Sequence, residues 1–161
     1  MLDFAGNLHL RPFALGDARV VEPWLVSPGL SVPAGCLRRE WPQRMLADQR
    51  IVALVAETED GRRLGFVRLD CGPDAIAEVT LVVAPDRRRA GFGRAMFHSA
   101  LRRARRLGLR GLIALVDLQN GPALAFFDDL GFAPAGRVGD RLRLWRHVHA
   151  GDHQQPLDIE S

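Results

Sequence analysis

The segment PDRRRAGFGRAMF (85–97) places a cluster of arginines and two glycines directly before an apolar stretch that can form a helix. Gly91 and Gly93 let the backbone turn sharply with its N–H groups pointing inward, and the positive end of the helix dipole adds to them. This geometry favours an anion, and pyrophosphate fits it best. The alternative interpretation is a glycine-lined turn with solvated arginines. The side chains that can add charged hydrogen bonds are Arg88, Arg89 and Arg94.

The residues around this turn argue against two common phosphate sites. A P-loop needs a lysine after its second glycine, and the chain contains no lysine. A dinucleotide-binding turn needs a third glycine, whereas Met96 occupies that position. Asp117 lies about where a ribose-binding acid would stand. The strands predicted before the turn are antiparallel, however, which disfavours a dinucleotide-binding fold.

Glu78 is the candidate general base. In the strand-like run AIAEVTLVV (75–83) it shares a face with Thr80 and Val82, so its carboxylate lies among apolar and weakly polar neighbours. Burial there raises the pKa of the carboxyl toward neutrality, where it can accept a proton from a reacting group. The alternative is a partly exposed strand residue that pairs with an arginine such as Arg68.

The first half of the chain predicts two helices and an antiparallel meander. Asp17 is predicted to cap the first helix, and Pro23 disturbs its last turn. Residues 36–49 are helical in composition, and Pro42 is expected to break or kink that helix. The predicted strands lie at 9–13, 50–56, 63–70 and 75–83.

The second half predicts a long helix, a buried strand, a short helix and a closing hairpin. Apolar residues recur at helical spacing from residue 93, and Gly108 lies where that helix should end. A strand, a helix and a strand at this spacing imply a right-handed parallel crossover. Asn120 is predicted to cap the short helix, and Gly131 lies just past its end. The predicted strands lie at 111–117, 133–138 and 141–148.

The composition predicts one globular domain at 1–149 and a polar tail at 150–161. Of the 161 residues, 47% are hydrophobic and 25% are charged. No apolar run approaches the roughly 20 residues that span a bilayer, and the N-terminal residues lack the features of a signal peptide. A cytoplasmic location and no membrane partner are therefore expected. Cys36 and Cys71 are expected to be free thiols.

Arginine supplies all the positive charge other than that of histidine. The net charge is only +3 although the pI is about 10.0, because no lysine or tyrosine titrates in the alkaline range. The cluster indicates either a site for an anionic ligand or a solvated helix face. Nucleic-acid binding is disfavoured because aromatic residues do not alternate with the arginines at stacking spacing. Nine arginines lie within 24 residues, at 87, 88, 89, 94, 102, 103, 105, 106 and 110.

Two blocks of sequence resemble one known family. The run Arg88-Arg89-Ala90-Gly91-Phe92-Gly93 resembles the Arg/Gln-x-x-Gly-x-Gly/Ala signature of the GNAT superfamily of N-acetyltransferases. Residues 120–132 are similar to the family's Asn-x-x-Ala…Tyr…Gly-Phe segment, and the resemblance extends over 9–148. It implies an α/β fold with a mixed, mostly antiparallel central sheet of about seven strands. The fourth and fifth strands would form a splayed parallel pair, and about four helices would flank the sheet.

The resemblance also implies a site for acetyl-CoA, the acetyl donor, in the gap between the fourth and fifth strands. Direct transfer to an amine needs a base, assigned to Glu78, and a backbone donor for the oxyanion, assigned to Val83 with Val82 as the alternative. No metal is implied. The implied coenzyme contacts are Leu81, Val82, Val83, Arg88, Arg89, Ala90, Gly91, Phe92, Gly93, Arg94, Asn120, Ala123, Phe126 and Phe127.

Phe127 departs from the family pattern, in which a tyrosine commonly protonates the departing thiolate. A phenyl ring can pack against the coenzyme but donates no proton, which leaves a non-catalytic acyl-CoA-binding module as an alternative function. Asp117 and Asp128 are candidate substitutes for the acid, although a strand-end or helix-surface role fits both. His147 and His149 are expected to be structural or surface residues.

The acceptor is the part of the reaction that the sequence leaves open. By resemblance, its groove would form from residues 24–42 and 137–143. The runs at 65–70 and 77–85 are similar to a GNAT subset that acts on amino-sugar nucleotides. An amino sugar, another small-molecule amine and a protein amine remain as acceptors, and the chain is expected to be a monomer or a homodimer.

Overall fold

A seven-stranded sheet forms the centre of the protein, in the order β1-β2-β3-β4-β5-β7-β6. The computed structural model describes residues 8–26, 39–87 and 91–149. All neighbouring strands are antiparallel except β4 and β5, which are parallel. The predicted fold class is confirmed. The strands are β1 (Leu8–Pro12), β2 (Ile51–Thr58), β3 (Arg63–Cys71), β4 (Ile76–Val83), β5 (Gly111–Asp117), β6 (Ala133–Val138) and β7 (Arg141–His147).

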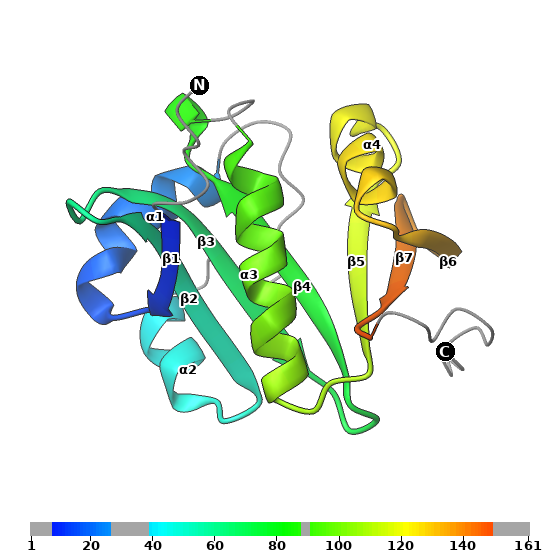
Figure 1. Cartoon of the computed structure of the whole chain (residues 1–161), viewed down its shortest axis with the longest axis horizontal. Helices are drawn as coiled ribbons and strands as arrows, with labels where there is room; N and C mark the ends of the chain where they lie inside the picture. The colour runs from blue at the N-terminus through cyan, green and yellow to red at the C-terminus, as the bar shows by residue number, and fades with distance from the viewer. Residues whose placement is uncertain (1–7, 27–38, 88–90, 150–161) are drawn as a thin grey trace.

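Helices cover both faces of the sheet, with α3 crossing one face and α1 and α2 lying behind the other (Figure 1). Two apolar cores result. The core under α3 and α4 includes Met96, Phe97, Phe127 and Phe132. The core under α1 and α2 includes Val21, Trp24, Trp41, Phe66 and Val82. The helices are α1 (Ala18–Leu25), α2 (Trp41–Ala47), α3 (Phe92–Arg106) and α4 (Gly121–Asp129), with 3₁₀ turns at Leu15–Asp17 and Pro85–Arg87.

The parallel strands β4 and β5 are joined only at their first residues. Their register pairs end at Glu78 and Ile113, although β4 continues to Val83 and β5 to Asp117. Figure 1 shows the two strands separating toward the end where α3 begins and α4 lies. Beyond Ile113, β5 is held by β7, with which it pairs along its whole length. The sheet therefore contains a wedge-shaped gap between β4 and β5.

Asp17 occupies the predicted cap position of α1, but its carboxylate makes no cap hydrogen bond. The carboxylate accepts instead from Arg11 at 2.8 and 2.9 Å, from Arg63 at 2.7 Å and from the Ala14 N–H at 2.8 Å. The expected capping role is wrong because two guanidinium groups on β1 and β3 outcompete the helix N–H groups for this buried acid. Asp17 thus ties the first helix to two strands.

Pro42 lies in the first turn of α2, so the predicted helix over 36–49 with a break at Pro42 is wrong in the part that the structure describes. The helix begins at Trp41 and places Pro42 in its first turn, where the missing N–H removes no intrahelical bond. Buried Trp41 and Met45 anchor α2, and the Trp41 indole donates to Glu22 at 2.9 Å. In the described residues, no helix has the length and apolar character needed to cross a membrane.

Candidate active site

Along β4, the backbone N–H and C=O groups of successive residues point alternately toward β3 and toward the gap. The Ala84 N–H donates to the Leu64 carbonyl at 2.8 Å, and the Gly72 N–H donates to the Ile76 carbonyl at 2.8 Å. The register between these bonds is unbroken, so the even-numbered residues of β4 bond to β3. The odd-numbered residues point their N–H and C=O groups toward β5. Past the last pair with β5, the odd-numbered residues are Val79, Leu81 and Val83, and Leu81 and Val83 lie nearer the open end of the gap.

This alternation separates two residues that the sequence placed together. Val82 lies opposite Phe66 on β3, its side chain is 1% exposed, and its N–H belongs to the β3 side of the ladder. Val83 turns its N–H to the gap. Of the two amides considered for stabilising an oxyanion, the geometry favours Val83.

The turn before α3 has the backbone shape expected of an anion site. Gly91 precedes the helix with a φ of 81°, which favours glycine. A β-carbon on Gly93 would lie 3.1 Å from the Phe126 ring and 3.4 Å from Val83, so glycine permits close packing of helix, ring and strand. Arg94 is exposed at the start of the helix. The predicted contacts that lie outside the described residues are Arg88, Arg89 and Ala90.

The start of α4 borders the gap from the side of β5. The Asn120 side chain accepts from the Ala123 N–H at 3.2 Å, so the predicted cap is confirmed. Phe127, 8% exposed, packs against Phe126 and Phe132 at ring separations of 5.3 and 5.1 Å. Because α3 and α4 both begin at the open end of the gap, the positive ends of two helix dipoles meet there (Figure 1).

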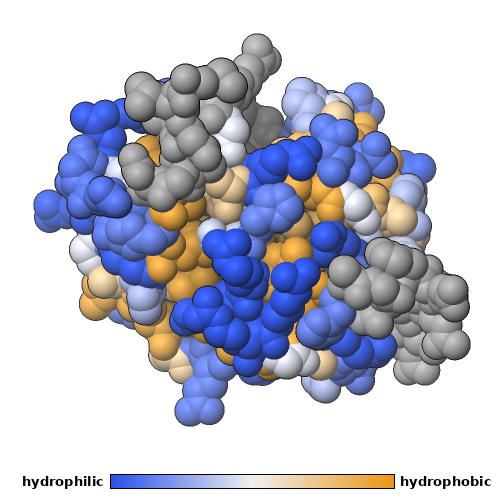
Figure 2. All heavy atoms as spheres, viewed as in Figure 1, coloured by the Kyte–Doolittle hydropathy of each residue, from blue (hydrophilic) through white to orange (hydrophobic). Residues whose placement is uncertain are grey.

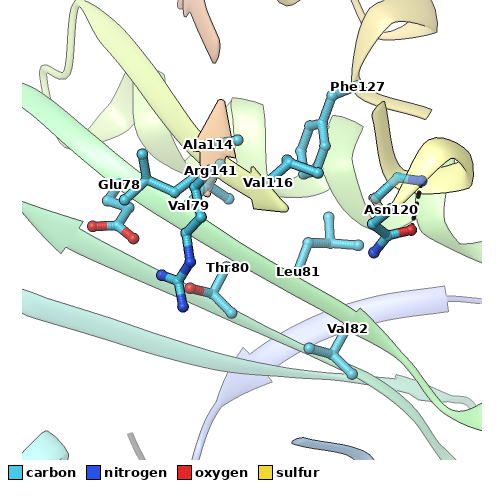
Figure 3. A pocket seen from close by; sticks show the side chains of 12 residues that line it. Glu78, Val79, Thr80, Leu81, Val82, Ala114, Val116, Asn120, Phe127 and Arg141 are labelled. Carbon is cyan, nitrogen blue, oxygen red and sulfur yellow. Dashed lines mark hydrogen bonds between the residues drawn. The ribbon is translucent and has the colours of Figure 1, made fainter. Parts of the chain in front are cut away.

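A pocket of about 60 Å³ lies where β4, β5 and α4 meet (Figure 3). Predicted residues outside its lining are Val83, Gly91, Phe92, Gly93, Arg94 and Phe126. The buried ring of Phe92 lines a different hollow, with Leu64 and Arg87. The pocket brings together six of the predicted residues, namely Glu78, Leu81, Val82, Asn120, Ala123 and Phe127.

Glu78 lies in this pocket, where its environment favours the neutral carboxyl. Burial raises the pKa of Glu78 above its ordinary value, and the charge of Asp70 on β3 adds to the increase. Arg141, Arg68 and Arg143 act in the opposite direction. Arg68, the arginine named in the alternative interpretation of Glu78, forms an ion pair with Asp70 at 2.8 Å. Within the described ranges, no ion pair forms on Glu78.

Three residues at or beside the pocket received no individual role from the sequence, although Arg141 and Arg143 fall within the range 137–143 predicted for the acceptor groove. Thr80 is a buried polar residue on the same face of β4 as Glu78, and Arg141 lines the pocket from β7. Arg143 lies one pleat further along β7 and influences the pKa of Glu78. The alternation of polar and apolar residues in RLRLWRH (141–147) is the signal that could have indicated the two arginines.

The remaining candidate residues lie away from the centre of the pocket. The Asp117 carboxylate accepts from the Gln119 N–H at 2.8 Å at the end of β5, and Asp128 is exposed on α4. The rings of His147 and Trp145 meet edge to face with their centroids 4.8 Å apart, and His149 is exposed beyond β7. Cys71 is a half-buried free thiol, as predicted, whereas Cys36 falls outside the described residues.

The arginines of α3 form a solvated surface. Figure 2 shows hydrophilic side chains gathered over the middle of the face that α3 crosses. Arg105 donates to the Val148 carbonyl at 3.2 Å, and Arg102 donates to Ser99 at 3.0 Å. This arrangement fits the predicted alternative of a solvated helix face for the helical arginines. The exposed arginines of the helix are Arg94, Arg102, Arg105 and Arg106.

The sequence of the chain matches a known family over most of this fold. Residues 21–132 match the model of the acetyltransferase (GNAT) family. The chain belongs to the GNAT acetyltransferase family. The predicted family is therefore confirmed, and the match includes both the glycine turn before α3 and the segment around α4.

Curated GNAT relatives include a mycothiol acetyltransferase of Thermomonospora curvata, 39% identical over 132 residues. These residues are 80% of this chain and 36% of that protein. An uncharacterised N-acetyltransferase of Methanocaldococcus jannaschii is 30% identical over 96 residues, which are 55% of this chain and 42% of that protein. The chain spans less than half the length of these curated relatives.

Solved GNAT structures share the fold. A spermidine N-acetyltransferase from Vibrio cholerae matches with a TM-score of 0.76 at 21% identity, over 89% of this chain and 95% of that chain. A structure of the Vibrio cholerae enzyme in complex with CoA and spermine matches with a TM-score of 0.74 at 19% identity, over 88% of this chain and 96% of that chain. At this identity, the likeness concerns the fold alone.

Proposed function

We propose that the chain transfers an acetyl group from acetyl-CoA to a primary amine by direct attack. The observation that carries the proposal is the gap between β4 and β5, into which Leu81 and Val83 direct backbone groups that pair with no described strand. A pantetheine arm carries amides that can pair with such groups as an added strand would. The pyrophosphate would lie at the Gly91 turn and the start of α3, where backbone N–H groups and the helix dipole favour negative charge.

The chemistry needs three functions, and this site offers groups for two of them. The Glu78 carboxylate would take a proton from the amine, directly or through one water, and its raised pKa makes it a stronger base. The amine nitrogen then forms a bond to the thioester carbon. The oxyanion that develops would accept a hydrogen bond from the Val83 N–H. As the carbon–sulfur bond breaks, the electron pair leaves with the thiolate.

The third function, protonation of the thiolate, has no side-chain donor at Phe127. A thiol with an ordinary pKa near 8.5 is a good leaving group compared with an amide nitrogen, so a proton from solvent suffices. Phe127 would instead provide an apolar wall beside the reactive end of the coenzyme. The acceptor in this proposal is an amino sugar or another small-molecule amine.

Thermal unfolding with and without acetyl-CoA tests the coenzyme site. Saturating acetyl-CoA should raise the Tm of the wild type, because a ligand that binds only the folded state stabilises it. Gly91→Val should abolish the increase, since its side chain would project at the turn where the diphosphate binds. No described atom lies within 4 Å of a β-carbon there, but the φ of 81° strains any side chain, so the Tm of ligand-free Gly91→Val is first compared with that of the ligand-free wild type. Arg103→Ala on α3 is the matched control and should keep the increase. A wild-type Tm that ignores acetyl-CoA would contradict the proposal.

A second candidate function, a non-catalytic acyl-CoA-binding module, is favoured by Phe127 alone. Both functions predict binding of acetyl-CoA, so the Tm measurement does not distinguish the enzyme from the binding module. Release of free thiol with a panel of small amines and peptides separates them. Thiol release coupled to an acetylated product supports the enzyme and shows whether the acceptor is a small molecule or a protein amine. Binding without any product supports the module.

A further inference from the structure

Two arginines of β7 lie on the same face of the sheet as Glu78. Glu78 is level with Ile113 on β5, and Ile113 is in turn level with Trp145 on β7. Residues two apart along a strand share a face, so Arg143 and Arg141 follow Trp145 on that face. Two strand spacings, roughly 10 Å, separate β4 from β7 at the level of Glu78. A long arginine side chain can span much of that distance.

The arginine side chains approach the base. Figure 3 shows the Arg141 side chain reaching from β7 toward β4, with its guanidinium in the part of the pocket that holds Thr80 and Glu78. The charges of Arg141 and Arg143 both act on Glu78. Half-burial of both side chains strengthens that influence, because water screens it less.

Of these two arginines, Arg141 has an acidic residue level with it on β5, whereas Arg143 does not. Asp117 is level with Arg141, and Asp70 is already paired with Arg68. Arg143 is level with Leu115, so an apolar residue stands where an acid would balance it. Within the described part of the chain, Arg143 forms no ion pair. Arg143 lies beside the pocket that Arg141 lines, and its guanidinium is therefore available to a ligand.

We infer that the amine acceptor carries an anionic group, a carboxylate or a phosphate, which Arg143 and Arg141 bind while the amine faces Glu78. The inference rests on the proposed acetyltransferase function and deepens it. A guanidinium fork pairs two of its N–H groups with two oxygens of such an anion, which fixes orientation as well as position. An acceptor with a second ammonium group at the same place would instead meet like charge.

Matched pairs of acceptors test this inference in the wild type. Glucosamine 6-phosphate against glucosamine isolates the phosphate, and β-alanine against β-alaninamide isolates the carboxylate. Spermidine supplies the polycationic comparison. We expect kcat/KM to be at least about tenfold higher for the anionic member of one pair, mainly through a lower KM, and the pair that responds identifies the anion.

Substitution at Arg143 then assigns the preference to this residue. Arg143→Gln should remove most of the preference by raising KM for the anionic acceptor, and Arg143→Glu should reverse it. Arg102→Glu, the same change on the exposed face of α3, is the control and should leave the preference intact. An unchanged Tm for Arg143→Gln shows that the loss is not one of folding.

The outcomes separate this inference from the proposed function. Equal or better turnover of the neutral and cationic amines overturns the inference alone, because acetyl transfer then stands without an anionic acceptor. A preference that survives both Arg143 substitutions also overturns it. Failure to acetylate any amine overturns the proposed function together with the inference.

Discussion

Glu78 on β4 lies level with Ile113 on β5, and this is the last pair of residues that joins the two parallel strands. The candidate base therefore stands at the vertex of the gap, while the starts of α3 and α4 stand at its open end. A coenzyme bound with its diphosphate at the open end would extend its thioester toward the vertex. The spacing of diphosphate site and base thus follows from where the strands separate.

Replacing Glu78 by glutamine should impair chemistry and spare coenzyme binding. The substitution keeps the size of the side chain but removes its ability to accept a proton, so kcat/KM should fall by roughly 10² to 10⁴. The Kd for acetyl-CoA should stay within about twofold, since the coenzyme is held by backbone groups elsewhere. Steady-state kinetics and calorimetric titration measure the two quantities. Full activity in Glu78→Gln would assign the residue a structural role only.

The pH dependence of the reaction should respond to Asp70. The negative charge of Asp70 raises the pKa of Glu78, so Asp70→Asn should lower that pKa. The change also releases Arg68 from its partner, which favours the Glu78 carboxylate further. A base with a lower pKa is deprotonated at lower pH. The rising limb of kcat/KM against pH should therefore move to lower pH, and a limb that stays in place or moves upward would contradict the role of Glu78.

Phe127→Tyr tests whether the reaction needs an acid for the thiolate. The variant adds one hydroxyl to a ring that already lines the pocket, so kcat should change by less than about tenfold and the fold should persist. For the wild type, kcat should rise with pH as base and amine deprotonate, without a falling limb. Should the wild type bind acetyl-CoA and acetylate nothing while Phe127→Tyr gains activity, the binding-module interpretation takes the place of the enzyme.

Asp17 should make the free energy of unfolding depend on pH in the acidic range. Hydrogen bonds from Arg11 hold the pKa of this buried carboxyl well below its usual range, with Ala14 and Arg63 contributing. Its stabilisation is present above the unfolded pKa, near 3.9, and is lost as pH falls below that value. Asp17→Asn should reduce the free energy of unfolding at pH 7 by about 3–5 kcal/mol.

Urea denaturation at pH 7 and at pH 3 measures this difference. The difference in free energy of unfolding between the wild type and Asp17→Asn should be smaller at pH 3. The wild-type carboxylate loses part of its stabilisation there, whereas the amide does not titrate. An equal difference in free energy of unfolding at both pH values would assign the loss of stability to packing rather than to charge.

The regular parts of the fold could be predicted because their local signals agree. The strands at 111–117 and 133–138 have the predicted bounds, and the meander before them follows from turn residues between apolar runs. The helices α1 and α2 were harder to predict. Pro42 can end or begin a helix, and only tertiary anchoring by Trp41 and Met45 selects the second.

The sequence could predict those features of the candidate site that depend on a single strand. Alternation along β4 foretold the half-buried position of Glu78, and its raised pKa followed. Arg141 and Arg143 fall within the range 137–143 predicted for the acceptor groove, but their position beside Glu78 depends on the register of β7 on β5, which the sequence of neither strand specifies. The choice between Val82 and Val83 likewise needed the pairing of β4 with β3.

Amide hydrogen exchange in β4 tests the central claim most directly, since each residue reports which side of the strand is occupied. In the free protein, the Leu81 and Val83 amides should exchange faster than those of Thr80 and Val82, which face β3. Saturating acetyl-CoA should slow exchange at Leu81 and Val83 by at least about tenfold and change Thr80 and Val82 little. Exchange at Leu81 and Val83 that is unaltered by saturating acetyl-CoA would contradict binding of the coenzyme in the gap.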